Sequence, residues 1–269
     1  MTVAFVFQGG AGLAAVQVGM VRALTDAGIR PDIVVGSSAG ALNAVAFAQD
    51  PTERGLDALQ RLWVGVRRSD VFPVSLRSLA AGLTGRGDSL VASDGLRSLV
   101  ERGLRVRDLR DTVIPVHVVA TDALTGSTVV LSDGPAAQAL LASAAIPGIL
   151  SPVERDGRLL IDGSVSADIP ILQAEALGAT TSYVLPSLVP VSPAGAPSGA
   201  LPILLRTMGM LLDRTATRDL AAARGDVHLL PAPSLSGVTP LDFRHGVELM
   251  RLGRETALGW LAERAGAAA

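Results

Sequence analysis

Two short apolar segments near the N-terminus, each followed by a small-residue turn and a helical pattern, most constrain the fold of this chain. Val3–Phe7 is a continuous apolar run that ends at a pair of glycines, and Leu13–Ala27 then spaces its apolar residues as a helix does. Asp32–Val35 repeats the strand pattern and leads through Gly36–Gly40 into a second helix. Strand–helix–strand with wholly apolar strands is typical of a parallel sheet covered by helices.

Further strand and helix patterns continue this arrangement along the chain. The expected strands lie at Pro115–Thr121, Thr128–Leu131, Arg158–Ile161, Ser182–Leu185 and Val227–Leu230, with helical patterns between most of them. A stretch rich in Pro, Gly, Ser and Ala at 186–202 predicts a long surface loop, and a final helix is expected from about Leu241. We find no internal repeat and no linker, so one α/β domain is expected.

The composition excludes several classes of protein. The formal net charge is −2 and the pI is near 5.9, so the overall charge gives no electrostatic reason to bind nucleic acid or strongly anionic membranes. The chain has no cysteine, so disulfides, thiol catalysis and cysteine-ligated metal are excluded. The N-terminal residues lack the pattern of a signal peptide, and the longest apolar stretch, 33–48, is interrupted by Gly, Ser and Asn. We therefore expect a soluble, cytoplasmic protein.

The second turn has the pattern of a nucleophile elbow. Gly36-Ser37-Ser38-Ala39-Gly40 fits G-x-S-x-G, with a buried strand expected before it and a helix after it. The flanking glycines leave room for the sharp turn that a catalytic serine requires, and the helix directs unpaired N–H groups towards a developing anion. The alternative is an ordinary small-residue turn between a strand and a helix. The strand-to-helix context favours a nucleophilic Ser38.

The first turn, Gln8-Gly9-Gly10-Ala11-Gly12, also follows a strand and opens a helix. Since adjacent parallel strands end at the same edge of a sheet, both turns should border one crevice. The backbone N–H groups of this loop are suited to an oxyanion hole. The alternative is dinucleotide binding, because the loop also fits G-x-G-x-x-A. That site needs an acidic residue at the end of the second strand, where this chain has Gly-Ser-Ser.

A nucleophilic serine needs a base, and the chain offers three histidines. His117 and His228 lie within apolar strand patterns typical of structural residues, and His245 lies in a helical or loop setting near the C-terminus. A better candidate is Asp162, which ends a strand immediately before Gly163. A partly desolvated carboxylate can act as a base because burial raises its pKa. Taken alone, an Asp-Gly pair is more often a hairpin turn.

These pieces occur in the order and spacing of the patatin-like phospholipase family, which the chain resembles. That family has a glycine-rich loop, then G-x-S-x-G, then Asp-Gly followed by a small residue, which is Ser164 here. Supporting matches are Ala120-Thr121-Asp122 with Thr125-Gly126, Ala142–Gly148 with Pro152-Val153, Ile169-Pro170 and Leu177-Gly178-Ala179. The likeness is strong from Val3 to about Leu185 and thinner towards the C-terminus.

The resemblance implies a three-layer α/β/α sandwich with a central, mostly parallel sheet, in a single domain over residues 1–269. Its core would span about 3–185, with a C-terminal helical part at about 200–269. The implied activity is cleavage of acyl esters of lipids, as a phospholipase A, lipid acyl hydrolase or esterase, with no metal or cofactor. The implied partners are a lipid or ester substrate and, transiently, a lipid surface.

The resemblance also assigns the site. It makes Ser38 the nucleophile, Asp162 the general base, and the backbone N–H groups of Gly9, Gly10, Ala11 and Gly12 the candidate oxyanion hole. The chain departs from the family pattern in several places. Leu13 stands where many members have Arg or Lys, Ser164 where the family usually has Gly or Ala, and Asp168 where it has Asn. The glycine loop also has one glycine fewer, with Gln8 and Ala11 interrupting the run. The loss of the basic residue leaves an alternative open, a catalytically weak or silent relative that binds lipid or a protein partner.

One later segment is unusually apolar. Its apolar residues are Ile203, Leu204, Leu205, Met208, Met210, Leu211 and Leu212. Such a helix would suit a lid over an acyl-binding groove or a contact with a lipid surface. A core helix explains the composition more simply, so we favour the core for Ile203–Leu212.

Overall fold

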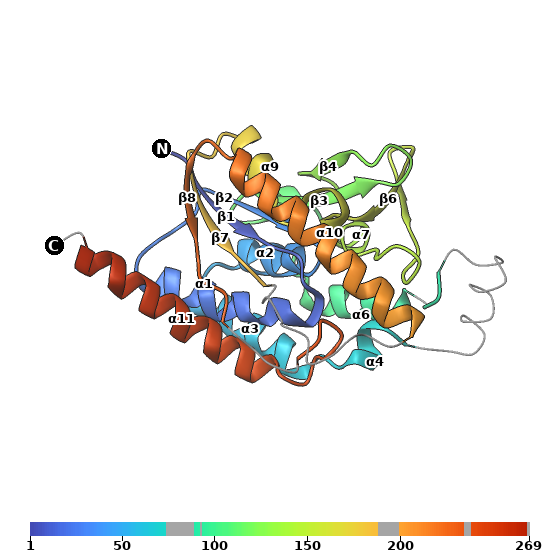
Figure 1. The fold of residues 1–269 in the computed structure, drawn as a ribbon, viewed down its shortest axis with the longest axis horizontal. Coiled ribbons are helices and arrows are strands. Elements are labelled where there is room, and N and C mark those ends of the chain that lie inside the picture. The colour runs from blue at the N-terminus through green and yellow to red at the C-terminus, as the bar shows by residue number, and fades with distance from the viewer. Residues whose placement is uncertain (74–88, 92, 188–198, 234–237, 268–269) are drawn as a thin grey trace.

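The first strand shows how the layers of the molecule form. In the computed structural model, which describes residues 1–73, 89–91, 93–187, 199–233 and 238–267, β1 (Val3–Phe7) runs inside the sheet (Figure 1). Phe5 and Phe7 pack into a core on one face of the sheet, whereas Ala4 and Val6 pack into a second core on the other face. Helices therefore cover both faces, as the continuous apolar run predicts.

The described residues form one sheet of eight strands. After β1 come β2 (Ile33–Ser37), β3 (Val116–Asp122), β4 (Thr128–Leu131), β5 (Val153–Arg155), β6 (Arg158–Asp162), β7 (Thr181–Leu185) and β8 (Asp226–Leu229). Their order is β5-β6-β3-β2-β1-β7-β8, and β4 also pairs with β3. The pairs from β3 through β2, β1 and β7 to β8 are parallel, whereas β4, β5 and β6 pair antiparallel.

The helices form the two outer layers. One layer consists of α1 (Val16–Asp26), which follows a 3-10 turn at Ala11–Ala15, with α2 (Ala39–Gln49), α3 (Glu53–Gly65), α6 (Asp94–Gly103), α7 (Ala136–Ser143) and α11 (Gly246–Ala267). The other consists of α8 (Ser164–Ala167), α9 (Ile171–Ala176) and α10 (Ala200–Ala222). Short helical turns at Arg68–Val71 (α4) and Leu109–Asp111 complete the described elements. The expected α/β/α architecture with a mostly parallel sheet is confirmed (Figure 1).

The two ends of the sequence meet where α11 crosses α1 (Figure 1). A Cβ atom at Gly19 of α1 would lie 1.9 Å from the carbonyl oxygen of Met250, and one at Gly253 of α11 would lie 2.1 Å from that of Val16. Glycine on both helices therefore permits a backbone approach that any side chain would prevent. The C-terminal part also contributes to the sheet, since β8 pairs with β7.

Most predicted elements agree with the structure to within a few residues, and the exceptions have local reasons. The strand β5 was not predicted, because three residues are too few to show a period. The final helix begins at Gly246 rather than near Leu241, after a turn in which Arg244 bonds back to Asp242. Most of the predicted loop at 186–202, namely 188–198, lies outside the described residues, and α10 begins at Ala200.

The favoured core assignment of Ile203–Leu212 is wrong. Ile203, Leu204, Met210 and Leu211 are 50%, 56%, 51% and 55% exposed. The side chain of Leu205 lies outside the described residues. Composition alone cannot say which face of a helix meets the sheet, and here the buried contacts come later in α10, from residues such as Ala216. Within the described residues, no helix is long and apolar enough to cross a membrane.

Candidate active site

Strand register brings the two predicted catalytic side chains together. Ser37, the last residue of β2, pairs with Val119 of β3, and the next residue of β3, Ala120, pairs with Asp162 of β6. Because β6 runs antiparallel to β3, its C-terminal residue lies beside the C-terminal end of β2. Ser38 follows directly, and its Oγ–H donates a hydrogen bond of 2.7 Å to Oδ2 of Asp162. Both side chains are buried.

Ser38 has the backbone of a nucleophile elbow. Its φ of 53° and ψ of −127° are unfavourable for a residue with a side chain, so the surrounding contacts have to stabilise this conformation. The turn is also crowded: a Cβ atom at Gly40 would lie 2.3 Å from the carbonyl oxygen of Gln8. The first turn of α2 therefore packs directly against the loop that follows β1.

The end of α7 fixes both residues of the pair. The backbone N–H of Ser38 donates to Oγ of Ser143 at 2.9 Å, and that hydroxyl donates to the carbonyl oxygen of Val119 at 2.6 Å. The carbonyl oxygens of Ser143 and Ala145 accept from the N–H groups of Gly163, at 3.0 Å, and Asp162, at 2.9 Å. Residues 143–145 therefore set the position of the serine relative to the carboxylate. This role was missed from the sequence, where these residues lay in a matched motif without an assigned function.

Burial determines the acidity of Asp162. The residue is 4% exposed, and its burial raises the pKa to about 6, from an ordinary value of 3.8. Hydrogen bonds from Ser38 and from the N–H of Ser164, which donates to Oδ1 at 2.8 Å, oppose this rise. The charge of Asp168 adds to it. The alternative of an Asp-Gly hairpin is wrong, because β6 leads at this point into α8.

Asp168 interacts both with Asp162, through its charge, and with the glycine loop, through hydrogen bonds. Its Oδ2 accepts from Nε2 of Gln8 at 2.7 Å, and its carbonyl oxygen accepts from the N–H of Gly9 at 3.1 Å. Asp168 is 1% exposed, and burial raises its pKa, while hydrogen bonds from Gln8 and Ser164 oppose the rise. The sequence showed only that Asp168 departs from the family pattern. Its contacts with the loop appear in the structure alone.

The amide groups of the glycine loop are not equivalent. The N–H of Gly9 donates to Asp168, and that of Gly12 donates to the carbonyl oxygen of Pro240 at 2.8 Å. Among the described residues, no acceptor is bonded to the N–H of Gly10 or Ala11. Ala11 has a φ of 48°, which turns the chain sharply at this point. The amides of Gly9 and Gly12 therefore hold the shape of the loop, whereas those of Gly10 and Ala11 take no part in these bonds.

An apolar cavity extends from the serine. Its walls come from α2, α3, α4, α6 and α7 and from Phe243, and Ala11 and Ser38 are among its lining residues. Trp63 and Phe243 stack across one wall, with ring centroids 6.4 Å apart. The indole N–H of Trp63 donates to Oδ1 of Asn43 at 2.8 Å. Nδ2 of Asn43 donates to the carbonyl oxygen of Ala14 and to Oε1 of Gln17, so the polar atoms of both side chains are satisfied. The apolar lining of the cavity suits an aliphatic group.

Among the described residues, no histidine is hydrogen-bonded to Ser38 or Asp162. His117 bonds to Ser132 at 2.7 Å, and its burial lowers its pKa. His228 packs against Tyr183, and His245 lies 3.3 Å from Glu248. In the same part of the chain, no group of three or more His, Asp or Glu side chains is gathered to hold a metal ion.

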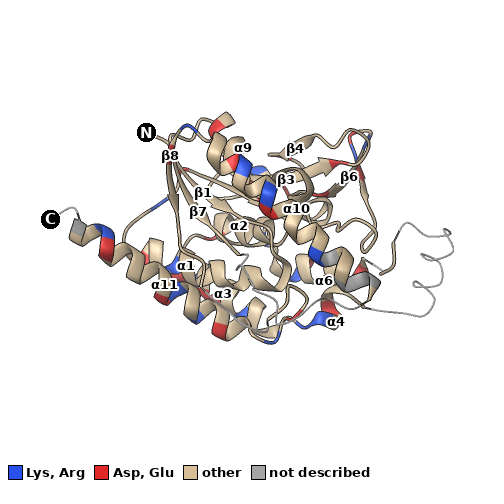
Figure 2. Cartoon of the chain, in the orientation of Figure 1, with Lys and Arg blue, Asp and Glu red and all other residues tan. Residues whose placement is uncertain are grey.

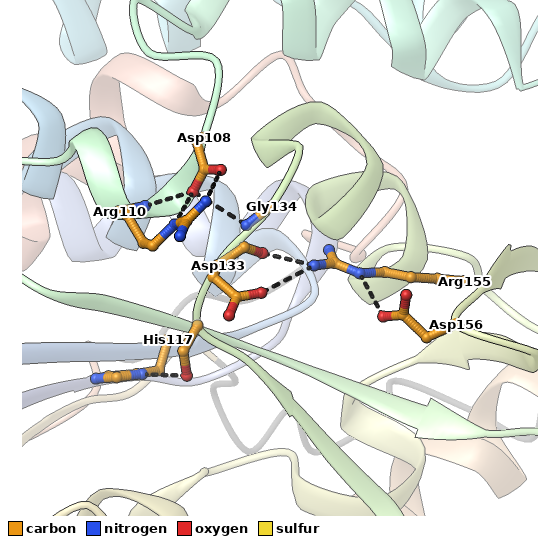
Figure 3. A network of polar contacts seen from close by, with 8 residues as sticks. Asp108, Arg110, His117, Asp133, Gly134, Arg155 and Asp156 are labelled. Atoms are coloured by element: carbon orange, nitrogen blue, oxygen red, sulfur yellow. Dashed lines mark hydrogen bonds and ion pairs between the residues drawn. The ribbon is translucent and has the colours of Figure 1, made fainter.

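A second polar network lies at the other end of α7 (Figure 3). Nη2 of Arg155, in β5, donates to the carbonyl oxygen of Asp133 at 2.5 Å, and the N–H of Gly134 donates to Asp108 at 3.0 Å. The same Asp108 carboxylate accepts two bonds from the side chain of Arg110. These contacts hold the turn that begins α7. The N-terminal end of α7 is thus fixed by these polar contacts, and its C-terminal end holds the turn at Ser38.

The site thus combines a buried serine–carboxylate pair at a strand-to-helix elbow with a glycine loop and an apolar cavity, in an α/β/α sandwich. The family model described as Patatin-like phospholipase matches residues 5–175, and the chain belongs to that family. Patatin-like phospholipase domain-containing protein 7 of Rattus norvegicus is 28% identical over 179 residues, covering 66% of this chain and 13% of that protein.

One further relative and one solved structure extend the comparison. An uncharacterized NTE family protein of Mycobacterium tuberculosis is 28% identical over 273 residues, covering 94% of this chain and 45% of that protein. The chain thus spans less than half the length of either relative. The crystal structure of VipD from Legionella pneumophila superposes with a TM-score of 0.53 at 12% identity, covering 97% of this chain and 66% of that one. At this identity the likeness concerns the fold.

We expect Asp162→Asn to stabilise the protein at neutral pH. The pKa of Asp162 is raised in the folded state, so stability falls as the pH rises from about 4 to about 6, and the charged form is a net cost above that window. Asparagine removes the charge and can still donate to Ser38 and accept from Ser164. The expected gain in the free energy of unfolding at pH 8 is on the order of 1–3 kcal/mol, measured with urea.

Asp122→Asn is the matched control for this prediction. Hydrogen bonds from the N–H groups of Thr125 and Leu124 hold the pKa of Asp122 below its ordinary value, so its charged form is favoured by folding. This variant should therefore lose stability at pH 8. If Asp162→Asn is less stable than the wild type at pH 8, and by the same amount at pH 4, burial of the Asp162 charge does not oppose folding.

Proposed function

We propose that the chain is a lipid acyl hydrolase in which Ser38 is the nucleophile and Asp162 the general base. The hydrogen bond from Ser38 Oγ to Asp162 Oδ2 is the observation on which this proposal rests. It is supported by the raised pKa of Asp162, which brings the carboxylate close to the acidity useful for a base at neutral pH. The apolar cavity that begins at Ser38 supports a substrate with a long acyl chain.

The geometry suits a two-step reaction. Asp162 takes the proton as Ser38 Oγ attacks the ester carbonyl carbon, and the carbonyl oxygen becomes an oxyanion. The tetrahedral intermediate collapses, the C–O bond to the alcohol breaks, and the alcohol leaves with the proton from Asp162. A water molecule then gives a proton to Asp162 while its oxygen attacks the acyl-enzyme. Collapse of this second intermediate releases the fatty acid and returns a proton to Ser38.

The proposed oxyanion hole contains fewer backbone N–H groups than the four candidates from the sequence. The amides of Gly9 and Gly12 donate to backbone carbonyls, so we assign the oxyanion to the N–H groups of Gly10 and Ala11. Leu13, which stands where many relatives have a cation, is buried and 3% exposed. The proposed stabilisation of the oxyanion therefore comes from backbone dipoles and from the N-terminal end of α2, without a charged side chain in this loop.

Removing either member of the pair should abolish turnover. On a p-nitrophenyl ester of a fatty acid, Ser38→Ala and Asp162→Asn should each lower kcat by about 10³-fold or more, because neither the attack nor the proton transfer has a substitute. His245→Ala is the control and should leave kcat within about twofold, since its ring contacts Glu248 and Asp242 instead. A large loss in His245→Ala with an active Asp162→Asn would restore a histidine triad.

The pH profile tests the base independently. Asp162 acts only when ionised, so kcat/KM should fall below about pH 6, the pKa of that carboxyl. Ser38, Ser164 and Asp168 face it, and Asp213 of α10 in turn raises the pKa of Asp168. Asp168→Asn keeps an acceptor for Gln8 but removes a negative charge, which should lower the pKa of Asp162.

We therefore expect the acid limb of Asp168→Asn to move to lower pH, by up to about 1 unit. Asp156→Asn removes an equal charge at an exposed position far along the sheet, beside Arg155, and should leave the limb unchanged. The measurement is kcat/KM against pH for the three proteins. A limb that does not move in Asp168→Asn, or that moves equally in Asp156→Asn, would contradict the assignment of Asp162.

A further inference from the structure

The outward side of α10 carries an unusual group of exposed apolar residues. Ile203, Leu204, Met210 and Leu211 are all at least half exposed, within nine residues of sequence. Other large exposed apolar residues, such as Leu124, Val113 and Val64, are scattered over separate elements. Isolated exposed apolar side chains are normal, whereas a contiguous group usually marks a surface that binds something.

Helix geometry places this group opposite the buried side of α10. Residues 203, 207, 210 and 214 share one face at 3.6 residues per turn, and 204 and 211 adjoin it. The buried residues Ala216 and Asp219 fall on the opposite face, where α10 packs on α8 and α9. The apolar face is therefore turned to solvent, and α10 would have to rotate about its axis to bring it towards the sheet.

Arginines border this apolar face. Arg206 and Arg214 lie on it or beside it, and within the described part of the chain neither is in an ion pair. Arg218, one turn further, pairs with Asp219, and its side chain remains 71% exposed. The exposed Asp213 is the only acidic residue on this part of α10 besides the buried Asp219. Figure 2 marks these few charged positions along the ribbon of α10.

We propose that the outward face of α10, defined as Ile203, Leu204, Met210 and Leu211 with Arg206 and Arg214, docks the protein on an anionic lipid surface. Aliphatic side chains bordered by arginines are suited to the headgroup region, where the apolar part enters the acyl boundary and the guanidinium groups meet phosphate. Four half-exposed aliphatic side chains offer well under the roughly 800 Å² that each partner buries in a stable protein complex. The face also lacks the aromatic anchors common at such interfaces.

The position of α10 connects this surface to the site. The helix packs on α8, whose first residue, Ser164, donates its N–H to Asp162. A lipid surface held on α10 would therefore lie on the layer of helices that supports the carboxylate of Asp162. This inference deepens the proposed function and rests on it.

The test measures binding, so that it does not depend on turnover. The inactive Ser38→Ala protein is mixed with vesicles of phosphatidylcholine alone, or of phosphatidylcholine with phosphatidylglycerol, and the bound fraction is measured by flotation. We expect binding to the anionic vesicles. Leu204→Ser with Leu211→Ser in that background should lower the binding constant about tenfold or more. Arg206→Gln with Arg214→Gln should lower it about tenfold on anionic vesicles only.

Leu124→Ser is the matched control, because it removes an equally large side chain that is 84% exposed in the turn between β3 and β4. It should leave binding unchanged. The inference is overturned if the Ser38→Ala protein does not bind vesicles, or if the Leu204/Leu211 pair binds as well as its parent. It is equally overturned if that pair instead dissociates a dimer in sedimentation velocity.

Turnover of a soluble short-chain ester by otherwise wild-type protein separates the two proposals. The Leu204→Ser/Leu211→Ser variant should retain this turnover, because neither side chain lines the cavity or contacts the serine–carboxylate pair. If vesicles bind but no ester is cleaved, the docking surface stands and the proposed hydrolysis fails.

Discussion

The hydrogen bond between Ser38 and Asp162 is the contact on which the rest of this site depends. The carboxylate of Asp162 is buried, and an unpaired charge there would be very unfavourable. The serine hydroxyl and the N–H of Ser164 compensate part of that cost, and the remainder raises the pKa of Asp162. Burial, only partly offset by these hydrogen bonds, makes the charged carboxylate unfavourable for folding. The same excess of burial raises the pKa of Asp162 into the range suited to the proposed base.

Several unfavourable local features have to be held in place by the fold around them. Ser38 keeps a strained backbone because Ser143 bonds to it, and the carbonyl oxygens of residues 143 and 145 accept bonds from Gly163 and Asp162. Helix α7, which ends at Ser143, is fixed at its other end by the network around Arg155. The glycine loop is held from the opposite layer by Asp168. These supports come from different elements and from both faces of the sheet.

The N-terminal part of this arrangement was predictable from sequence, and the reasons are local. An apolar run, a small-residue turn and a helical period lie within forty residues, so both turns and their shared edge follow from pattern alone. Asp162 could be matched by motif, but its place beside Ser38 depends on an antiparallel register that no local pattern encodes. The same limit hid the roles of Ser143 and Asp168, and it made α10 look like a core helix.

The central claim is that Ser38 is the nucleophile, activated in this buried pair. It is tested most directly by reacting the native protein with a fluorophosphonate at pH 8 and locating the adduct by peptide mass spectrometry. The account predicts a single adduct, on the peptide that contains Ser38, which is absent from Ser38→Ala and formed much more slowly by Asp162→Asn. An adduct on another serine, such as Ser164 or Ser187, or no adduct at all on the folded protein, would contradict it.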